Sequence, residues 1–158
     1  MTAPDLTLID DIRAASRQMV RELGFLEQTL AATDYPPSAV HAIIEIGARG
    51  PMTSSRLADL LHLEKSSVSR MVRKLIECGE LNEQADANDA RIKPLSLTAR
   101  GRRTLATIED FARRQVSSAL EQLTDAERRT VREGLAIYAQ ALRADRVAET
   151  DSALRPVA

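Results

Sequence analysis

Six residues with hydroxyl or cationic side chains occur close together between Ser66 and Lys74. On a helix that turns about 100° per residue they fall on one side. They are Ser66, Ser67, Ser69, Arg70, Arg73 and Lys74. The apolar residues of the same stretch, which a core would bury, fall on the other side: Val68, Met71, Val72, Leu75 and Ile76. Arginine can donate two hydrogen bonds to a guanine edge, and serine and lysine can reach phosphates or bases. The polar side therefore predicts a surface that binds a polyanion.

A plain solvent-exposed helix face is the alternative interpretation of this pattern. Such faces usually mix charges of both signs, whereas these six residues include no carboxylate. We therefore favour binding over simple exposure.

A second group of charged residues follows this helix in a segment rich in turn-forming residues. Asp89 precedes Arg91 by two positions, so its carboxylate could orient the guanidinium by a charge-assisted hydrogen bond. Lys93 follows Arg91 by two positions. An Asp-x-Arg pair alone is a weak motif, and its value here lies in its position after a basic helix. The segment could lie along a nucleic-acid backbone or enter a minor groove.

Apolar spacing and helix-terminating residues predict the elements that position these groups. We expect helices over about 6–32, 38–48, 53–61 and 66–78, a hairpin from 81–85 and 93–97, and helices over 98–123 and 124–146. Thr53 and Ser66 are expected N-caps, and Gly79 is expected to end the fourth helix. Thr124 and Glu127 form a capping-box pattern.

Composition limits the class of protein. The 158 residues are 44% hydrophobic and 28% charged, which is typical of a folded globular chain. The sequence shows neither an apolar run long enough to span a membrane nor a secretory signal pattern, so we expect a cytoplasmic location. The single cysteine, Cys78, excludes an internal disulfide framework.

The net charge of −1 hides an uneven distribution. Residues 49–103 contain eleven basic and seven acidic residues, a net charge of +4, which leaves −5 for the rest of the chain. A basic centre between acidic flanks indicates a local site for a polyanion.

Three segments of the chain occur in a characteristic order. They are Arg56-Leu-Ala-Asp-Leu-Leu-His-Leu-Glu-Lys-Ser-Ser-Val-Ser-Arg-Met-Val-Arg-Lys-Leu75 followed by Gly79, then Asp89-Ala-Arg91, and then Leu97-Thr-Ala-Arg-Gly-Arg102. Together they resemble the multiple antibiotic resistance regulator (MarR) family. The resemblance implies a mainly α fold with a small β-hairpin wing (α+β). Residues 38–103 would form a winged helix-turn-helix, and residues 1–37 with 104–158 a helical dimerisation region. The family often has a second arginine where this chain has Ala90.

By this resemblance the chain is a non-enzymatic transcriptional regulator, with a repressor expected, that binds double-stranded DNA as a homodimer at a near-palindromic operator. The helix from Ser66 would enter the major groove and Arg91 the minor groove. The expected DNA contacts are Thr53, Lys65, Ser66, Ser67, Ser69, Arg70, Arg73, Lys74, Asp89, Arg91 and Lys93. A small aromatic or anionic effector is a possible partner, with Met19, Leu23, Phe25 and His41 as candidate pocket residues. No cofactor is expected.

Several alternatives stay open at this point. Cys78 could be a redox or metal sensor, although its neighbour Glu77 disfavours a thiolate, and we favour an inert thiol. His41 and His62 lack recognisable metal-ligand spacing, so we expect structural roles. Met19, Leu23, Phe25 and His41 could also be ordinary core residues. The rival function is a non-catalytic regulatory or protein-interaction module, related to MarR-like domains that are fused to acetyltransferases.

Overall fold

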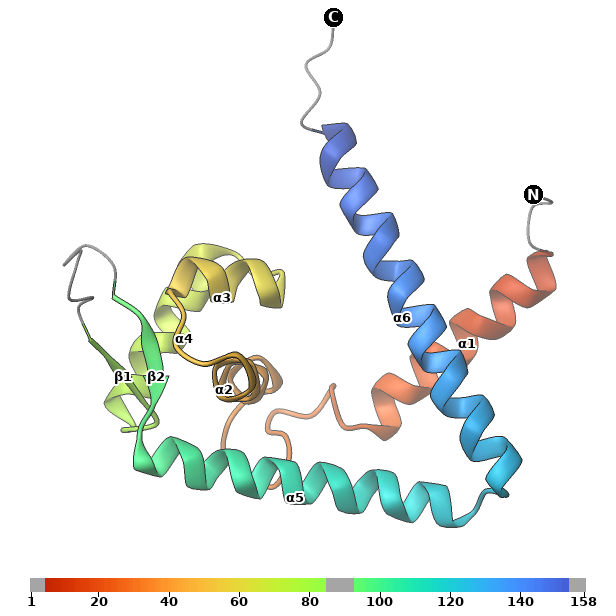
Figure 1. Cartoon of the computed structure of the whole chain (residues 1–158), viewed down its shortest axis with the longest axis horizontal. Helices are drawn as coiled ribbons and strands as arrows, with labels where there is room; N and C mark the ends of the chain where they lie inside the picture. The colour runs from red at the N-terminus through yellow and green to blue at the C-terminus, as the bar shows by residue number, and fades with distance from the viewer. Residues whose placement is uncertain (1–4, 85–92, 154–158) are drawn as a thin grey trace, which may run out of the picture. The chain divides into compact units, whose positions relative to one another are not determined.

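The computed structural model describes residues 5–84 and 93–153, with side chains to residue 147 (Figure 1). Contacts between residues divide the chain into two compact units, Met1–Ala112 and Arg113–Ala158. The elements are α1 (Leu6–Glu22), α2 (Pro37–Arg49), α3 (Ser54–Leu61), α4 (Lys65–Glu77), β1 (Leu81–Glu83), β2 (Leu95–Leu97), α5 (Ala99–Glu121) and α6 (Asp125–Ala153). The predicted class, mainly α with a small β-hairpin, is confirmed.

The first helix is shorter than the prediction of residues 6–32. It ends at Glu22 because Gly24 takes the left-handed conformation, with φ +78°. The Gly24 amide donates to the Arg21 carbonyl at 3.0 Å, and the Phe25 amide donates to the Val20 carbonyl at 3.1 Å. These two bonds satisfy carbonyls of the last turn and end the helix. Apolar residues keep a helical spacing beyond Gly24, so the periodicity predicted a helix that continues past this glycine.

The second and third helices agree with the sequence to within one or two residues. Thr53 caps α3 as predicted, because its hydroxyl oxygen accepts the Arg56 amide at 3.2 Å. The predicted N-cap role of Ser66 is wrong. The N-cap of α4 is Glu64, whose carbonyl accepts the amides of Ser67 and Val68, both at 3.0 Å. Ser66 therefore already lies in the first helical turn and is exposed.

Gly79 ends α4 as predicted. Its φ is +74°, and its amide donates to the Ile76 carbonyl at 2.9 Å. The next amide, of Glu80, donates to the Leu75 carbonyl at 2.9 Å. This pair of bonds directs the chain from the end of the helix straight into β1.

The hairpin pairs β1 with β2 in antiparallel register, with Leu81 opposite Leu97 and Glu83 opposite Leu95. Both strands are shorter than the predicted 81–85 and 93–97. Met52 and Leu95 add a bridge of two backbone hydrogen bonds, 2.8 and 3.2 Å long. The expected tip residues Asp89 and Arg91 lie outside the described residues.

The core of the first unit lies among α2, α3, α4, the hairpin and the first half of α5. It comprises Ala31, Ala39, Val40, Ala42, Ile43, Ile46, Met52, Leu57, Ala58, Val68, Val72, Leu75, Leu81, Leu95 and Ile108. Helix α2 contacts α3, α4 and β2, and α4 contacts α3 and β1. The apolar side of α4 therefore packs in the core, and its polar side remains on the surface.

Thr98 joins the hairpin to α5. Its hydroxyl oxygen accepts the Gly101 amide at 3.0 Å, which is the capping bond expected where the helix begins. The same hydroxyl donates to the Gly79 carbonyl at 2.5 Å, and the Thr98 amide donates to the Glu80 carbonyl at 3.0 Å. One side chain therefore fastens the start of α5 to the end of α4.

Replacing Thr98 by alanine should destabilise the first unit by about 1–2 kcal/mol, because a cap bond and a bond to the half-buried Gly79 carbonyl are lost together. Urea unfolding followed by circular dichroism measures this. Thr98→Ser keeps the hydroxyl and is the matched control, which should stay within about 0.5 kcal/mol of the native chain. Equal losses in both variants would show that the methyl group matters and the hydroxyl does not.

The capping box before α6 is confirmed. The Thr124 amide donates to Glu127 Oε2 at 2.8 Å, and the Glu127 amide donates back to Thr124 Oγ1 at 3.3 Å. Hydrogen bonds to its carboxylate from the Thr124 hydroxyl, at 2.7 Å, and from the Thr124 amide hold the pKa of Glu127 below its usual value. The helix continues to Ala153, beyond the predicted end near Arg146. In the part of the chain that the structure describes, no helix is both long enough and apolar enough to cross a membrane.

Candidate nucleic-acid interface

Helix α4 separates its apolar and polar residues as the sequence predicts. Val68, Val72 and Leu75 are buried. The residues on the opposite side are exposed, except for half-buried Ser67: Lys65, Ser66, Ser69, Arg70, Arg73 and Lys74. Because the core holds one side of the helix, the cations on the other side project from a rigid element. Such a helix is suited to enter a DNA groove.

The first turn of α4 carries groups of both charges. Glu64, at the N-cap, makes no side-chain cap bond, so the amides of this turn stay open to another acceptor. Arg70 Nη2 donates to Ser67 Oγ at 3.3 Å, which places a guanidinium beside this turn. An open hollow of about 660 Å³ lies here, lined by residues that include Asp59, Glu64 and Lys65. The helix dipole, Lys65 and the serine hydroxyls favour a phosphate, and the two carboxylates oppose it.

The far end of this face is less basic than the sequence suggested. Helix α4 includes Glu77, which is exposed and lines a hollow of about 320 Å³ together with Ser69, Arg73 and Glu83. The expected absence of carboxylates thus holds for Ser66–Lys74 and fails one turn later. Arg70 is therefore the less screened of the two guanidiniums.

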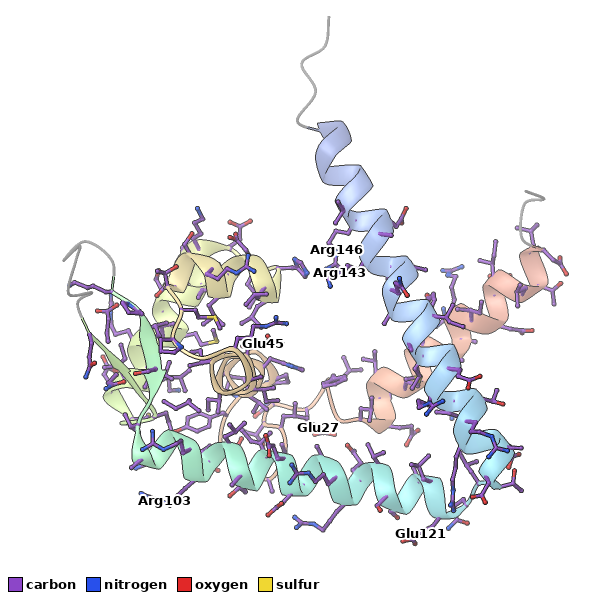
Figure 2. All side chains as sticks on the ribbon, in the orientation of Figure 1. Glu27, Glu45, Arg103, Glu121, Arg143 and Arg146 are labelled. Atoms are coloured by element: carbon purple, nitrogen blue, oxygen red, sulfur yellow. The ribbon has the colours of Figure 1, made fainter. Side chains whose placement is uncertain are left out.

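The remaining expected contacts lie around this helix. Thr53 is half-buried and its hydroxyl oxygen already accepts the Arg56 amide, whereas Lys93 is exposed two residues before β2. Arg49 forms a salt bridge with Glu45, labelled on α2 in Figure 2. Arg103, labelled on α5 in the same figure, is exposed. Four of the eleven basic residues of 49–103 therefore lie on α4, and Arg49 is paired elsewhere.

Two of the four candidate effector residues lie together. The rings of Phe25 and His41 are 5.6 Å apart between centroids and tilted by 40°. Met19 lies in the last turn of α1, and its carbonyl accepts the amide of Leu23, the C-cap. Within the described residues the structure holds no group of three or more His, Cys, Asp or Glu side chains that could bind a metal.

Glu80 is a site residue that the sequence did not predict. It follows the helix-ending glycine, and its side chain is only 1% exposed. Its Oε1 accepts a hydrogen bond from the Tyr35 hydroxyl at 2.8 Å and from Arg100 Nε at 3.0 Å. A carboxylate between a glycine and a short strand has the pattern of a surface residue. The sequence therefore carried no signal for this burial beyond the apolar Leu81 beside it.

The environment of Glu80 keeps its carboxyl ionised. Burial raises its pKa, but interactions with the side chains of Thr104, Tyr35 and Arg100 outweigh this, so the pKa lies below its usual 4.5. Burial also raises the pKa of Tyr35 to about 12, and the bond to Glu80 adds to this shift. At neutral pH the phenol is therefore a donor and the carboxylate an acceptor.

A pH dependence of stability follows from the lowered pKa of Glu80. A carboxyl whose folded-state pKa lies below the unfolded value stabilises the fold above that value, and this contribution disappears as the pH falls through the folded-state pKa. Glu80→Gln should therefore be less stable than the native chain at neutral pH, with the difference shrinking below about pH 4.5. Urea titrations over this range measure it. Exposed Glu83→Gln should show a small difference at every pH, and a constant gap for Glu80→Gln would contradict the assignment.

Residues 33–92 match the model of the MarR family. This segment includes α2, α3, α4 and β1, and it therefore contains the exposed face of α4. This segment is the part of the chain that is similar to the MarR family. A protein assigned as the transcriptional regulatory protein for the hcr operon of Thauera aromatica is 29% identical over 119 residues, covering 75% of this chain and 68% of the relative.

Solved structures of this family share the fold. A MarR family protein from Bacillus stearothermophilus superposes with a TM-score of 0.77 at 19% identity, covering 89% of this chain and 99% of the other. FabT of Streptococcus pneumoniae, solved in complex with DNA, gives a TM-score of 0.73 at 22% identity, covering 88% of this chain and 98% of the other.

Proposed function

We propose that this chain is a transcriptional regulator of the MarR family, that it binds specific double-stranded DNA through the exposed face of α4, and that it acts by binding alone, without catalysis. The observation that carries the proposal is the arrangement of α4, whose buried side holds it in the core while Arg70, Lys74 and the serines are exposed. FabT, which shares the fold, has been solved in complex with DNA, and this supports the same use here.

Each residue on this face has an expected role. Arg70 is suited to read base edges in the major groove, since arginine pairs with two acceptors of guanine. Lys65 and Ser66, at the positive end of the helix dipole, are suited to hold phosphates, as are Ser67, Ser69 and Lys74. Arg73 contributes charge beside the carboxylates of Glu77 and Glu83. Thr53 and Lys93 are expected to contact the backbone, and Asp89 with Arg91 to approach the minor groove.

A homodimer is the assembly that we propose. Large apolar side chains are exposed along α1 and α6: Leu6, Leu8, Ile12, Met19, Val20, Val131, Leu135, Ile137, Tyr138, Leu142 and Val147. Every α6 side chain from Asp125 to Val147 is exposed. Apolar surface of this extent usually lies against a partner, and a second copy is the simplest one. The dimerisation region would comprise residues 1–37 and 104–158, and residues 38–103 would contact DNA. Sedimentation equilibrium should therefore give twice the mass of the 17.4 kDa chain.

The two-fold symmetry of the proposed dimer predicts the form of the operator. Paired α4 helices would contact two half-sites about one helical turn apart, so a near-palindromic sequence is expected. We propose repression by occupation of a promoter. An effector that changes the separation of the two DNA-binding regions could shift affinity by about 1–3 kcal/mol. Met19, Leu23, Phe25 and His41 remain the proposed lining of that effector site.

Binding to DNA from the region upstream of the chain's own gene tests the proposal. Fluorescence anisotropy of a labelled duplex should show saturable binding that weakens steeply between about 50 and 200 mM salt. An unrelated duplex of equal length and base composition is the control, and it should bind much more weakly. If selection from random duplexes also enriches no sequence, the proposal is wrong and the interaction-module interpretation takes its place.

A further inference from the structure

A polar pocket of about 480 Å³ lies beside the C-terminal end of α4, within the first unit. The segment before α2 contributes Asp34 and Tyr35, the end of α4 contributes Lys74, and α5 contributes Arg100 and Thr104. Glu80 also lines it. This volume falls in the range of pockets that hold small molecules. The pocket shares no residue with the proposed effector lining around Phe25 and His41.

One oxygen of Glu80 has unused hydrogen-bonding capacity. Oε1 accepts bonds from Tyr35 and Arg100, whereas Oε2 is buried and makes no hydrogen bond of good geometry among the described residues, although the Thr104 side chain interacts with the same carboxylate. A buried carboxylate oxygen without a donor is costly, and most such groups in proteins are satisfied by protein, water or ligand. The position therefore favours a donor supplied from the pocket.

The charges around the pocket include both signs. Lys74 and Arg100 are cationic, and Asp34 and Glu80 are anionic. The Arg100 side chain is 61% exposed, so it compensates the buried carboxylate only in part. A purely cationic ligand would meet Lys74 and Arg100, and a purely anionic ligand would meet Glu80. A ligand that carries both charges avoids either repulsion.

We propose that this pocket binds a small zwitterion of the amino-acid class, whose ammonium group donates to Glu80 Oε2 and whose carboxylate accepts from Lys74 and Arg100. An ammonium makes a charge-assisted bond to the buried carboxylate, which is stronger than the bond from a neutral hydroxyl or water. The Thr104 hydroxyl on the same wall adds a polar group that can orient the ligand.

A regulatory consequence rests on the proposed DNA-binding function. Lys74 lines the pocket and also belongs to the exposed face of α4. A carboxylate that holds Lys74 toward the pocket removes one cation from DNA contact. Saturating ligand should therefore weaken DNA binding and lower its salt dependence by about one phosphate contact.

Ligand binding is tested on the full chain without DNA. Each proteinogenic L-amino acid is added singly while the melting temperature is measured, and any that raises it is titrated by calorimetry. The N-acetyl derivative, which lacks the ammonium, and the decarboxylated amine, which lacks the carboxylate, are the matched ligands. We expect at least one amino acid to bind, and both derivatives to bind about tenfold more weakly or worse.

Two variants locate the site. Glu80→Gln should weaken binding about tenfold or more, whereas exposed Glu83→Gln should bind like the native chain. Lys74→Gln changes an exposed residue and so keeps the test valid if Glu80→Gln fails to fold; it should weaken the amino acid but leave the decarboxylated amine unaffected. The proposal is overturned if no amino acid binds, if Glu83→Gln weakens binding as much as Glu80→Gln, or if Lys74→Gln leaves the amino acid unaffected.

The ligand-binding proposal and the DNA-binding proposal are tested by different measurements. Calorimetry without DNA reports only on the pocket, and anisotropy without amino acid reports only on the α4 face. Loss of ligand binding with intact DNA binding would overturn the zwitterion site alone. Ligand binding without DNA binding would overturn the proposed function and leave the pocket assigned.

Discussion

Replacing Arg70 and Arg73 together by alanine should reduce affinity for the specific duplex at least about thirtyfold, since each lost arginine contact costs about 1–3 kcal/mol. Both side chains are exposed on α4, whose opposite side is buried through Val68, Val72 and Leu75. The fold should therefore be unaffected. Anisotropy titrations at several salt concentrations measure both the affinity and the number of ionic contacts.

A charge-matched control separates a local contact from overall charge. Arg13→Ala with Arg132→Ala also removes two positive charges, from exposed ion pairs with Asp10 and Glu133. Affinity should change little, because such pairs contribute little and lie on α1 and α6. Of the two α4 arginines, Arg70 should account for more of the sequence preference, as Arg73 lies near Glu77 and Glu83. Equal losses in the two double variants would remove α4 from the DNA-binding assignment.

Replacing Gly101 by alanine should destabilise the first unit by about 3 kcal/mol or more, because the added carbon has no space. It would lie well inside van der Waals contact with the Glu80 carbonyl oxygen, 3.1 Å from the Glu80 carbonyl carbon and 3.2 Å from Leu97 Cδ2. Backbone atoms cannot move aside as a flexible side chain can. The Glu80 carbonyl also accepts the Thr98 amide, so a shift there weakens the junction of the hairpin and α5. Urea unfolding measures the loss.

Gly134→Ala is the matched control for this substitution. Gly134 lies within α6, and an added carbon there meets nothing within 4 Å among the described residues. Alanine has the higher helix propensity, so this variant should be as stable as the native chain or gain about 0.5–1 kcal/mol. If Gly101→Ala were also neutral, the close approach of α5 to β1 would be wrong.

Local signals in the sequence were sufficient for most helix boundaries. Gly79 predicted the end of α4, Thr53 the start of α3, and the Thr124–Glu127 pair the start of α6, because each of these devices involves residues within a single turn. The hydrophobic period of α4 also predicted which side is buried. These features depend on neighbours at three or four positions, which a sequence displays directly.

Two predictions, the end of the first helix and the N-cap of the fourth, were wrong because more than one boundary was acceptable locally. The first helix was extended to Ala32 because apolar spacing continued after Gly24, and a period does not show where a glycine turns left-handed. Ser66 is a good capping residue by type, but the turn after α3 places Glu64 at the N-cap first. In both cases the backbone conformation decided between two acceptable local choices.

By itself, then, the sequence determined the fold class and the exposed cationic side of α4, and it indicated the resemblance to the MarR family. It did so because helical periodicity, caps and the motif from Leu97 to Arg102 are all properties of short segments. Only the tertiary structure decided the role of Glu80. Its partners Tyr35 and Arg100 are 45 and 20 residues away, and a carboxylate becomes buried when the fold brings donors to it. The same folding explains Gly101, whose need for a small side chain comes from the Glu80 backbone against which α5 begins.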